Sequence, residues 1–158
     1  MDKLWAPWRF KYITDKKSKG CIFCQANRSK DKGYVIMKTQ HSLALLNIYP
    51  YNNGHIMIAP QRHTSGLSRL KDNELLDIMR CINSITQILD KVLKPQGYNI
   101  GINVGACSGA GVTGHLHIHI VPRWRGDTNF MPVLSDSKVI SQSLRELSKR
   151  LKSALKNA

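Results

Sequence analysis

Apolar residues recur along the chain with two different periods, and these periods predict the order of its elements. Short apolar runs bounded by Pro, Asn and Gly are typical of strands. Five such strands are expected over residues 34–37, 42–48, 54–59, 98–104 and 115–122. Between the third and the fourth, apolar residues recur every three or four positions over residues 73–93, which predicts an amphipathic helix. A second helix with this period is expected over residues 138–154, capped by Asp136 or Ser137.

The expected strands lie close together in the sequence, and only one long helix interrupts them. Asp72 or Asn73 can cap that helix, and Pro95 followed by Gly97 ends it. The stretch rich in Lys, Asn and Asp that leads to Gly33 is expected to be a loop. This order predicts an α+β domain, with a mostly antiparallel sheet of about five strands, the long helix packed on it and a second helix at the C-terminal end.

The composition places the chain among globular proteins. Its 158 residues are 42% apolar, enough for one packed core, whereas a disordered chain would hold far fewer Leu, Ile and Val. Its 11 Gly and 6 Pro are ordinary numbers that exclude a collagen-like or linker-like chain. Its 24 Lys and Arg against 10 Asp and Glu give a net charge of +14, which favours anionic partners: nucleotides, nucleic acid or an acidic membrane surface.

Export and a membrane span are not expected. No segment approaches the roughly 20 consecutive apolar residues that cross a bilayer, and residues 1–5 lack the apolar stretch of a secretion signal. Four cysteines are too few for a disulfide scaffold, so the pair Cys21 and Cys24, in a Cys-x-x-Cys spacing, is expected to bind metal or act in redox chemistry. We therefore expect a soluble cytoplasmic protein without a membrane partner.

Residues 1–20 form an arm of aromatic and basic side chains, among them Trp5, Trp8, Arg9 and Lys11. Aromatic side chains of this kind pack on the domain or contact a second copy of the chain. Interleaved with basic residues, they also suit stacking on nucleic-acid bases. Both interpretations of the arm stay open.

The most informative stretch holds His115, His117 and His119. Side chains alternate between the two faces of a strand, so the three imidazoles share one face and the apolar residues between them face the core. Packing alone does not explain such a row. Imidazoles two residues apart can bind one zinc ion. Alternatively, one of them can attack phosphorus as a nucleophile, with one ring nitrogen free and the other hydrogen-bonded, commonly to a backbone carbonyl.

A glycine-rich loop, residues 105–114, comes immediately before the histidines. Its glycines let backbone N–H groups approach an anion closely, and a phosphate held there would lie beside the histidine face. The sequence has no P-loop motif and no obvious carboxylate cluster for magnesium. The loop and the histidines together favour phosphoryl or nucleotidyl transfer.

Residues 115–121 resemble the motif of the histidine triad (HIT) family, His-x-His-x-His-x-x with x apolar, at every position. The similarity covers residues 21–131 and implies the histidine triad fold for that stretch, between the aromatic arm and a C-terminal helix within residues 132–158. Residues 4–13 and 122–131 are similar to the bacterial diadenosine tetraphosphate phosphorylases, a fragile-histidine-triad-like branch of the family.

The resemblance implies a role for each matching residue. His117 would be the nucleophile that attacks the α-phosphorus and carries the nucleotidyl group, and His119 would hydrogen-bond in the phosphate site. Asn103 would contact the nucleotide or its phosphate, and Asn47 the ribose hydroxyls. Trp124 either serves the phosphorylase branch or is a packed aromatic residue. Backbone donors to phosphate oxygens are expected from Gly111, Val112 and Thr113.

Some members of the family also carry a structural zinc ion. Its ligands here would be Cys21, Cys24, His63 and His115, the last of which also belongs to the catalytic row. Two thiolates and two imidazoles suit a closed tetrahedral zinc site, which would join the amino-terminal segment to the catalytic strand. The alternatives are a redox pair, which would require a βαβ unit that is not apparent, or unmodified thiols. No organic cofactor is implied.

The resemblance thus implies an enzyme that cleaves dinucleoside polyphosphates, best of all diadenosine tetraphosphate, through a nucleotidyl intermediate on His117. Inorganic phosphate as acceptor would give ADP and ATP, and water would give AMP and ATP; the flanking segments favour phosphate. The alternatives are a nucleoside phosphoramidate hydrolase of the same family, and a non-catalytic module that binds nucleotides or RNA. The family also implies a homodimer.

Overall fold

The computed structural model describes residues 20–29, 33–128, 140 and 142–156. Its helices and strands follow the chain as α2 (Ile22–Arg28), β1 (Val35–Lys38), β2 (Ser42–Leu46), β3 (Ile56–Pro60), η1 (Leu67–Arg69), α3 (Asp72–Leu93), β4 (Gly97–Ile102), η2 (Ala106–Ser108), β5 (Ile118–Arg123) and α5 (Leu144–Lys156). Residues 1–19 of the expected arm and the expected caps Asp136 and Ser137 lie outside the described residues.

Five antiparallel strands form one sheet in the order β1-β2-β3-β5-β4. The β2–β3 hairpin keeps one register from the Ser42–Pro60 pair to the Leu46–Ile56 pair. β5 comes last in the chain but pairs with both β3 and β4, so the histidine segment lies inside the sheet. The predicted α+β fold, with its five-stranded sheet, long helix and C-terminal helix, is confirmed.

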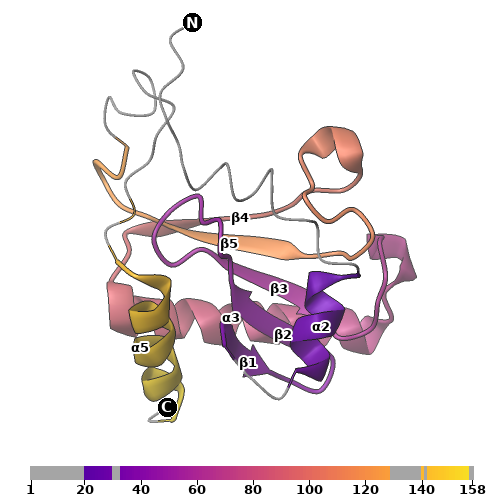
Figure 1. Ribbon diagram of the computed structural model, residues 1–158, viewed down its shortest axis with the longest axis horizontal. Coiled ribbons are helices and arrows are strands. Elements are labelled where there is room, and N and C mark those ends of the chain that lie inside the picture. The colour runs from indigo at the N-terminus through magenta and orange to yellow at the C-terminus, as the bar shows by residue number, and fades with distance from the viewer. Residues whose placement is uncertain (1–19, 30–32, 129–139, 141, 157–158) are drawn as a thin grey trace, which may run out of the picture.

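Helices cover both faces of the sheet, with α2 in front and α3 behind in the view of Figure 1. On one face, α3 packs against the sheet and buries Ile118 and Ile120 of β5, while α5 packs on α3 and β1. On the other face, α2 buries Phe23 against Leu45 and Met57. Because side chains alternate along β5, its isoleucines point toward α3 and its histidine toward α2. No helix in the described ranges has the length and apolarity needed to cross a membrane.

The helix α2 stands where the sequence predicted a loop before β1. It has seven residues, less than two turns, so no apolar period can be recognised in it. Its one buried side chain, Phe23, is fully enclosed, and no side chain caps its first turn. Tertiary packing rather than local propensity therefore accounts for this helix.

The helix α5 begins later in the chain than its apolar period predicted. Glu146 donates its backbone N–H to Ser143 Oγ at 3.2 Å, so Ser143 caps the helix. A glutamate three residues after a capping serine is typical of a helix start. Leu147 and Leu151 are fully buried and pack into the core beside α3. The Ser-x-x-Glu spacing was the sequence signal for this start.

The cap of α3 also differs from the prediction. The residue at the cap position is Lys71 rather than Asp72 or Asn73, and its backbone N–H donates to Glu74 Oε2 at 2.9 Å. At the other end, Lys94 adopts the left-handed conformation with φ of 49° and ends the helix as expected. Asn73 still takes part, because its Oδ1 accepts the backbone N–H of Glu74 at 3.0 Å, so the side chains of Asn73 and Glu74 together satisfy N–H groups at the start of the helix.

The loop between β2 and β3 turns at Gly54, whose φ is +79°. A Cβ at this position would lie 2.5 Å from Leu93 Cδ1 and 3.1 Å from Pro122 Cγ, and residues with a side chain rarely adopt this positive φ, so the position favours glycine. Asn52 ties the same loop to β5 by donating to the carbonyl of Pro122 at 2.9 Å. This close approach holds Tyr51 over the histidine face of the sheet.

Candidate active site

His117 directly precedes β5 and His119 lies within it, because β5 begins at Ile118 rather than at the predicted residue 115; both rings lie on the face covered by α2. His117 is 3% exposed and His119 is 8% exposed, and their ring centroids lie 4.9 Å apart in an edge-on contact. His119 pairs with Met57 of β3 and Gly101 of β4, which fixes its place in the sheet. Phe23 of α2 packs on the ring of His117 with centroids 5.0 Å apart. The imidazoles are thus held between the sheet and α2.

The ring of His117 is oriented by the chain itself. Its Nδ1 lies 2.9 Å from the carbonyl oxygen of His115. A carbonyl can only accept, so Nδ1 carries the proton and donates it. In the neutral ring, Nε2 then holds a lone pair and no proton. This is the arrangement that a nucleophilic imidazole needs.

A fourth histidine, His55, completes the row, although the sequence interpretation assigned it no role. Tyr51 donates its backbone N–H to His55 Nδ1 at 3.1 Å, so that nitrogen is an acceptor and Nε2 carries the proton. Nε2 of His55 lies 2.8 Å from Nδ1 of His119 and donates to it. His119 therefore carries its own proton on Nε2, a buried atom with no partner among the described residues. His55 directly precedes β3, and no spacing in the sequence marked it for this contact.

Burial keeps both of these imidazoles neutral. Burial, with smaller contributions from His119 and His117, lowers the pKa of His55 to about 3. Burial and then the neighbouring His117 lower the pKa of His119 to about 4. Near neutral pH, His119 is thus an uncharged ring with one free N–H donor on the active-site face.

The glycine-rich loop leaves β4 and returns to the histidines. Gly105 and Gly109 have φ of 88° and 85°, a conformation that other residues rarely adopt, and they flank the short helix η2. Val112 packs on the apolar cluster around Phe23, while Gly111 and Thr113 are exposed. The loop therefore rests on the same cluster that supports His117.

Three other residues predicted to contact the substrate, Asn47, Asn103 and Trp124, lie in different surroundings. Asn103 follows β4 two residues after Gly101, which pairs with His119. Asn47 is buried beside the row, with its Nδ2 3.3 Å from His55 Nδ1. The indole N–H of Trp124, in contrast, donates to the carbonyl of Lys94 at the end of α3, at 3.2 Å. The structure places Asn47 beside the histidines and Asn103 just past the end of β4, but engages the indole nitrogen of Trp124 elsewhere.

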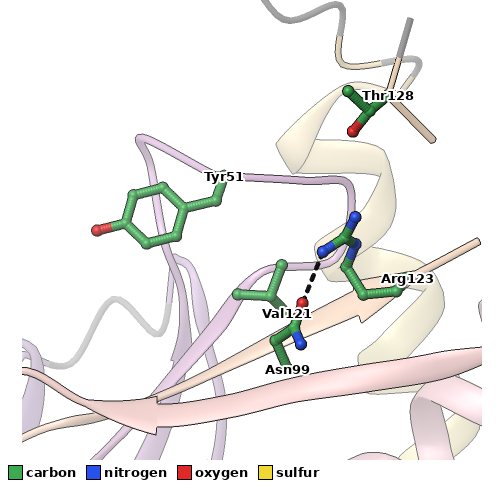
Figure 2. Close-up of a pocket in the computed structure, with 5 residues that line it drawn as sticks. All are labelled: Tyr51, Asn99, Val121, Arg123 and Thr128. Atoms are coloured by element: carbon green, nitrogen blue, oxygen red, sulfur yellow. Dashed lines mark hydrogen bonds between the residues drawn. The ribbon is translucent and has the colours of Figure 1, made fainter.

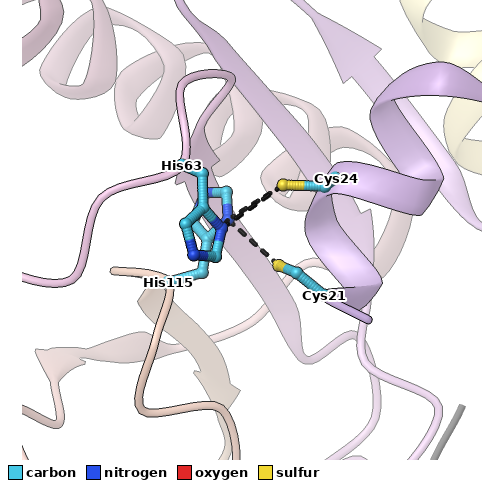
Figure 3. A group of neighbouring side chains, drawn as sticks. All are labelled: Cys21, Cys24, His63 and His115. Carbon is cyan, nitrogen blue, oxygen red and sulfur yellow. Dashed lines mark hydrogen bonds between the residues drawn. The ribbon is translucent and has the colours of Figure 1, made fainter. Parts of the chain in front are cut away.

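The four predicted metal ligands converge at the other end of the row (Figure 3). The ligand atoms of Cys21, Cys24, His63 and His115 all lie within 4.8 Å of one another. His115 Nδ1 is 3.1 Å from Cys21 Sγ and 3.7 Å from Cys24 Sγ. His63 Nδ1 is 3.2 Å from His115 Nδ1 and 3.4 Å from Cys24 Sγ. This geometry brings together residues that are up to 94 positions apart in the chain.

The cluster fits a tetrahedral zinc ion. Typical zinc bond lengths separate two nitrogen ligands by about 3.3 Å and a nitrogen from a sulfur by about 3.6 Å. His115 Nε2 donates to the carbonyl of Pro60 at 2.8 Å, so its Nδ1 presents a lone pair to the cluster. Burial and the neighbouring Cys21 raise the pKa of Cys24. These residues could therefore hold a metal ion.

An ion pair fixes the loop that carries His63. Arg62 donates Nε and Nη2 to the two carboxylate oxygens of Glu74, at 2.8 and 2.6 Å. The hydrogen bond to Arg62 is the largest cause of the lowered pKa of Glu74. A bidentate pair of this kind restrains the backbone next to His63 and ties it to α3.

Three comparisons with known proteins agree with this geometry. An AP-4-A phosphorylase of Mycobacterium tuberculosis is 35% identical over an alignment of 156 residues that covers 92% of this chain and 80% of the relative. An asymmetrical bis(5'-nucleosyl)-tetraphosphatase of Schizosaccharomyces pombe is 36% identical over 93 residues, covering 59% of this chain and 50% of that protein. The crystal structure of a zinc-bound histidine triad family protein from Mycobacterium smegmatis superposes with a TM-score of 0.71 at 26% identity, covering 87% of this chain and 94% of that one.

The HIT domain family matches residues 28–126, more than half of the chain. That stretch runs from the end of α2 through the whole sheet and past β5. It contains the histidine row, the glycine-rich loop and two of the four residues of the Cys/His cluster. The resemblance seen in the motif, the observed fold and the family match agree: the chain belongs to the HIT family.

Proposed function

We propose that this chain cleaves dinucleoside polyphosphates, best of all diadenosine tetraphosphate, by nucleotidyl transfer to His117. One observation carries the proposal: the carbonyl of His115 holds Nδ1–H of His117 at 2.9 Å, which leaves Nε2 as a free nucleophile. The phosphorylase relative of M. tuberculosis, at 35% identity over 92% of this chain, supports the class of substrate.

Transfer takes two displacements at one phosphorus. First, Nε2 of His117 attacks the α-phosphorus; a P–N bond forms, the bond to the bridging oxygen breaks, and ATP leaves. Then an oxygen of inorganic phosphate attacks the same phosphorus, the P–N bond breaks, and ADP leaves while the proton of the phosphate passes to solvent. Diadenosine tetraphosphate and phosphate thus give ADP and ATP, and His117 is restored.

We propose that the surrounding N–H donors stabilise the negative charge that develops on the oxygens of the reacting phosphate. Nε2–H of His119 is buried and has no partner within the described ranges, so we propose that it donates to a phosphate oxygen. Backbone N–H groups of Gly111, Val112 and Thr113 are proposed to meet the equatorial oxygens. Fixed donors need no reorganisation during the reaction, and one such donor is typically worth roughly 2.7–4 kcal/mol of barrier.

The asparagines are proposed to hold the substrate on either side of the reacting phosphorus. We assign Asn103 to the phosphate or nucleotide and Asn47 to the ribose hydroxyls. Oδ1 of Asn47 accepts from the backbone N–H of Tyr49 at 2.9 Å and keeps a second lone pair for a ribose hydroxyl. The bond from Trp124 to Lys94 favours the packed-aromatic interpretation of that indole.

We propose that the Cys/His cluster binds a structural zinc ion. All four ligand positions would be filled by the chain, so the ion would fix the ligands and take no part in the reaction. It would hold α2, through Cys21 and Cys24, against the segment that enters β5, through His115. The zinc-bound structure from M. smegmatis supports the choice of metal. A reducing cytoplasm, which keeps such thiols available, is the proposed location.

We propose that the active form is a homodimer joined at the outer edge of β4. β4 is the last strand of the sheet and, among the described residues, pairs only with β5. Ile100, Ile102 and Val104 are 48%, 36% and 52% exposed along this edge. An edge strand with open hydrogen-bonding groups and apolar side chains is a template for a second copy of itself.

The product profile tests the proposed reaction. Wild-type protein is incubated with diadenosine tetraphosphate, with and without inorganic phosphate, and the nucleotides are separated. ADP and ATP are expected in the presence of phosphate, and His117→Asn is expected to abolish turnover while its circular dichroism spectrum stays unchanged. Comparable turnover by His117→Asn would refute the nucleophile, and AMP as the main product in phosphate would replace phosphorolysis by hydrolysis.

The same assay decides between the alternatives. Rapid release of AMP from an adenosine phosphoramidate, with little activity on the dinucleotide, would assign the chain to phosphoramidate hydrolysis. No turnover of either compound, together with salt-dependent binding of RNA, would favour a binding module.

A further inference from the structure

A cavity of about 270 Å3 lies beyond the histidine row, and the proposed chemistry leaves it unused (Figure 2). Val121 and Arg123 follow His119 on the same face of β5, and Asn99 of β4 pairs with Val121. The cavity therefore continues the catalytic face toward the C-terminal end of β5. Its lining residues are Tyr51, Asn99, Val121, Arg123 and Thr128.

We infer that this cavity binds the nucleoside of the departing nucleotide, the half of the dinucleotide that never becomes attached to His117. The inference rests on the proposed function and extends it to the second half of the substrate. The cavity, which takes no part in the proposed reaction at His117, would thus contribute to the selection of the substrate.

The charges of the cavity favour a neutral ligand over a phosphate. Arg123 donates Nε and Nη2 to Asp127 Oδ2 and Oδ1 at 2.6 and 2.9 Å, so its charge is already balanced. Its Nη1 donates to Asn99 Oδ1 at 2.7 Å, as the dashed line in Figure 2 marks. No other cation lines the described part of the cavity. A phosphate would find little attraction here.

The shape and the remaining polar groups fit a nucleobase. The side chain of Tyr51 is 53% exposed, so part of its ring is open to a stacking partner. The Asn99 amide accepts from Arg123 through its oxygen, which leaves its NH2 group to donate to a ring nitrogen or carbonyl of a base. The volume is slightly below the roughly 300–1,000 Å3 of sites that enclose a whole small ligand, so it suits one part of a larger substrate.

The position separates the departing nucleoside from the retained one. The cavity lies on the β4 side of the histidine row, at Asn99, whereas Asn47, assigned to the retained ribose, lies on the other side of the row at the end of β2. The retained nucleoside is bonded directly to the reacting phosphorus and must lie close to His117. The departing nucleoside is three phosphates further away. The rings of Tyr51 and His119 stack with their centroids 5.6 Å apart. The cavity therefore begins next to His119, where we expect the polyphosphate chain to extend away from the histidines.

Binding to a variant that cannot turn over tests the inference directly. His117→Asn protein is titrated calorimetrically with diadenosine tetraphosphate and with adenosine tetraphosphate methylated on its terminal phosphate. The two compounds carry the same phosphates and charge and differ by one nucleoside. We expect the dinucleotide to bind about fivefold tighter or more, the lower end of what stacking of a base on an aromatic ring contributes.

Two further substitutions in the His117→Asn background locate the effect. Asn99→Ala removes the amide and Tyr51→Leu removes the aromatic ring, and each is expected to weaken binding of the dinucleotide while leaving the methylated compound nearly unaffected. Asn83→Ala, an exposed asparagine of α3 on the opposite face of the sheet, is the matched control and should change neither.

The outcomes separate this inference from the proposed function. Equal affinities for the two compounds in the His117→Asn parent, or a ratio that survives both cavity substitutions, would overturn the second nucleoside site and leave the proposed reaction intact. Failure of both compounds to bind would overturn both.

Discussion

At the residue scale, His55 decides which nitrogen of its neighbour His119 carries a proton. The chain of donors runs from the backbone of Tyr51 through His55 to His119, and each bond sets the tautomer of the next ring. Position 55 contacts no reacting atom, so it is a positioning residue. Its effect reaches the substrate only through the N–H that His119 presents.

Replacing His55 by phenylalanine should therefore lower kcat about tenfold or more, because His119 loses the donor that fixes its proton on Nε2. Ring-nitrogen NMR shifts of His119 should change from one tautomer in the parent to a mixture in the variant, which a purely structural loss would not produce. The control is His41→Phe, which should leave kcat unchanged, because the ring of His41 is hydrogen-bonded to Asn73 and lies away from the histidine row. An unaltered tautomer at His119 would contradict this role.

The neutral imidazoles also make the fold sensitive to acid. Both pKa values are lowered on folding, to about 3 and about 4, so the unfolded chain binds protons first as the pH falls below 6.5. The contribution of the two neutral rings to the free energy of unfolding is complete above pH 6.5 and is lost as the pH falls from 6.5 toward 4. Chemical denaturation of chelator-treated protein should give a free energy of unfolding about 2–4 kcal/mol lower at pH 5 than at pH 7.5. A flat profile over this range would show that the rings are not held neutral.

Sequence reasoning identified the triad and the glycine-rich loop because each is a local pattern. It missed His55 because this contact joins residues 64 positions apart, and a lone histidine at the start of a strand has no recognisable spacing. For Trp124, the motif could not decide between binding and packing, because the carbonyl that accepts its indole N–H belongs to a helix end 30 residues away.

At the element scale, α2 illustrates the limit of periodicity. The five strands and α3 are long enough to show their apolar pattern, and their positions were predicted within a few residues. α2 depends on the buried Phe23 and on the Cys/His cluster, to which Cys21 and Cys24 at the start of the helix contribute; the two histidines of that cluster lie after β3 and before β5. Without these partners, which are distant in the sequence, seven residues are too few to show a helical period.

Zinc should accordingly stabilise the junction between α2 and the catalytic segment. Protein purified without a His tag is expected to hold about one equivalent of zinc, and chelation should lower its Tm by about 5 °C or more. Cys24→Ser should abolish the zinc content and the chelator effect, whereas Cys107→Ser, an exposed cysteine of the glycine-rich loop, should retain both. Wild-type zinc content in Cys24→Ser would exclude the proposed ligand set.

The β2–β3 loop offers a second test at this scale. Gly54→Ala should destabilise the fold by about 1–3 kcal/mol, because the added Cβ meets Leu93 and the positive φ is strained. Gly97→Ala is the control, since a Cβ there meets nothing within 4 Å. Urea denaturation of the two variants measures the difference, and equal midpoints would contradict the close approach.

At the scale of the whole molecule, the sheet ends on an apolar edge. If β4 joins two copies, sedimentation should give a mass near twice 17.9 kDa, and Ile102→Lys should reduce it to one chain because a charge would be buried in the junction. Leu67→Lys, at an equally exposed leucine of η1, should leave the mass unchanged. A single-chain mass for the wild type would exclude the dimer.

One backbone atom, the carbonyl oxygen of His115, has a consequence for how the enzyme can be altered. The ring of His115 faces the cluster, whereas its carbonyl orients the ring of His117, the proposed nucleophile. A main-chain acceptor is present whatever side chain stands there. Replacing this histidine by cysteine would thus change one ligand of the proposed metal site and keep the carbonyl oxygen that orients the ring of His117. The metal site and the orientation of that ring can therefore be redesigned independently.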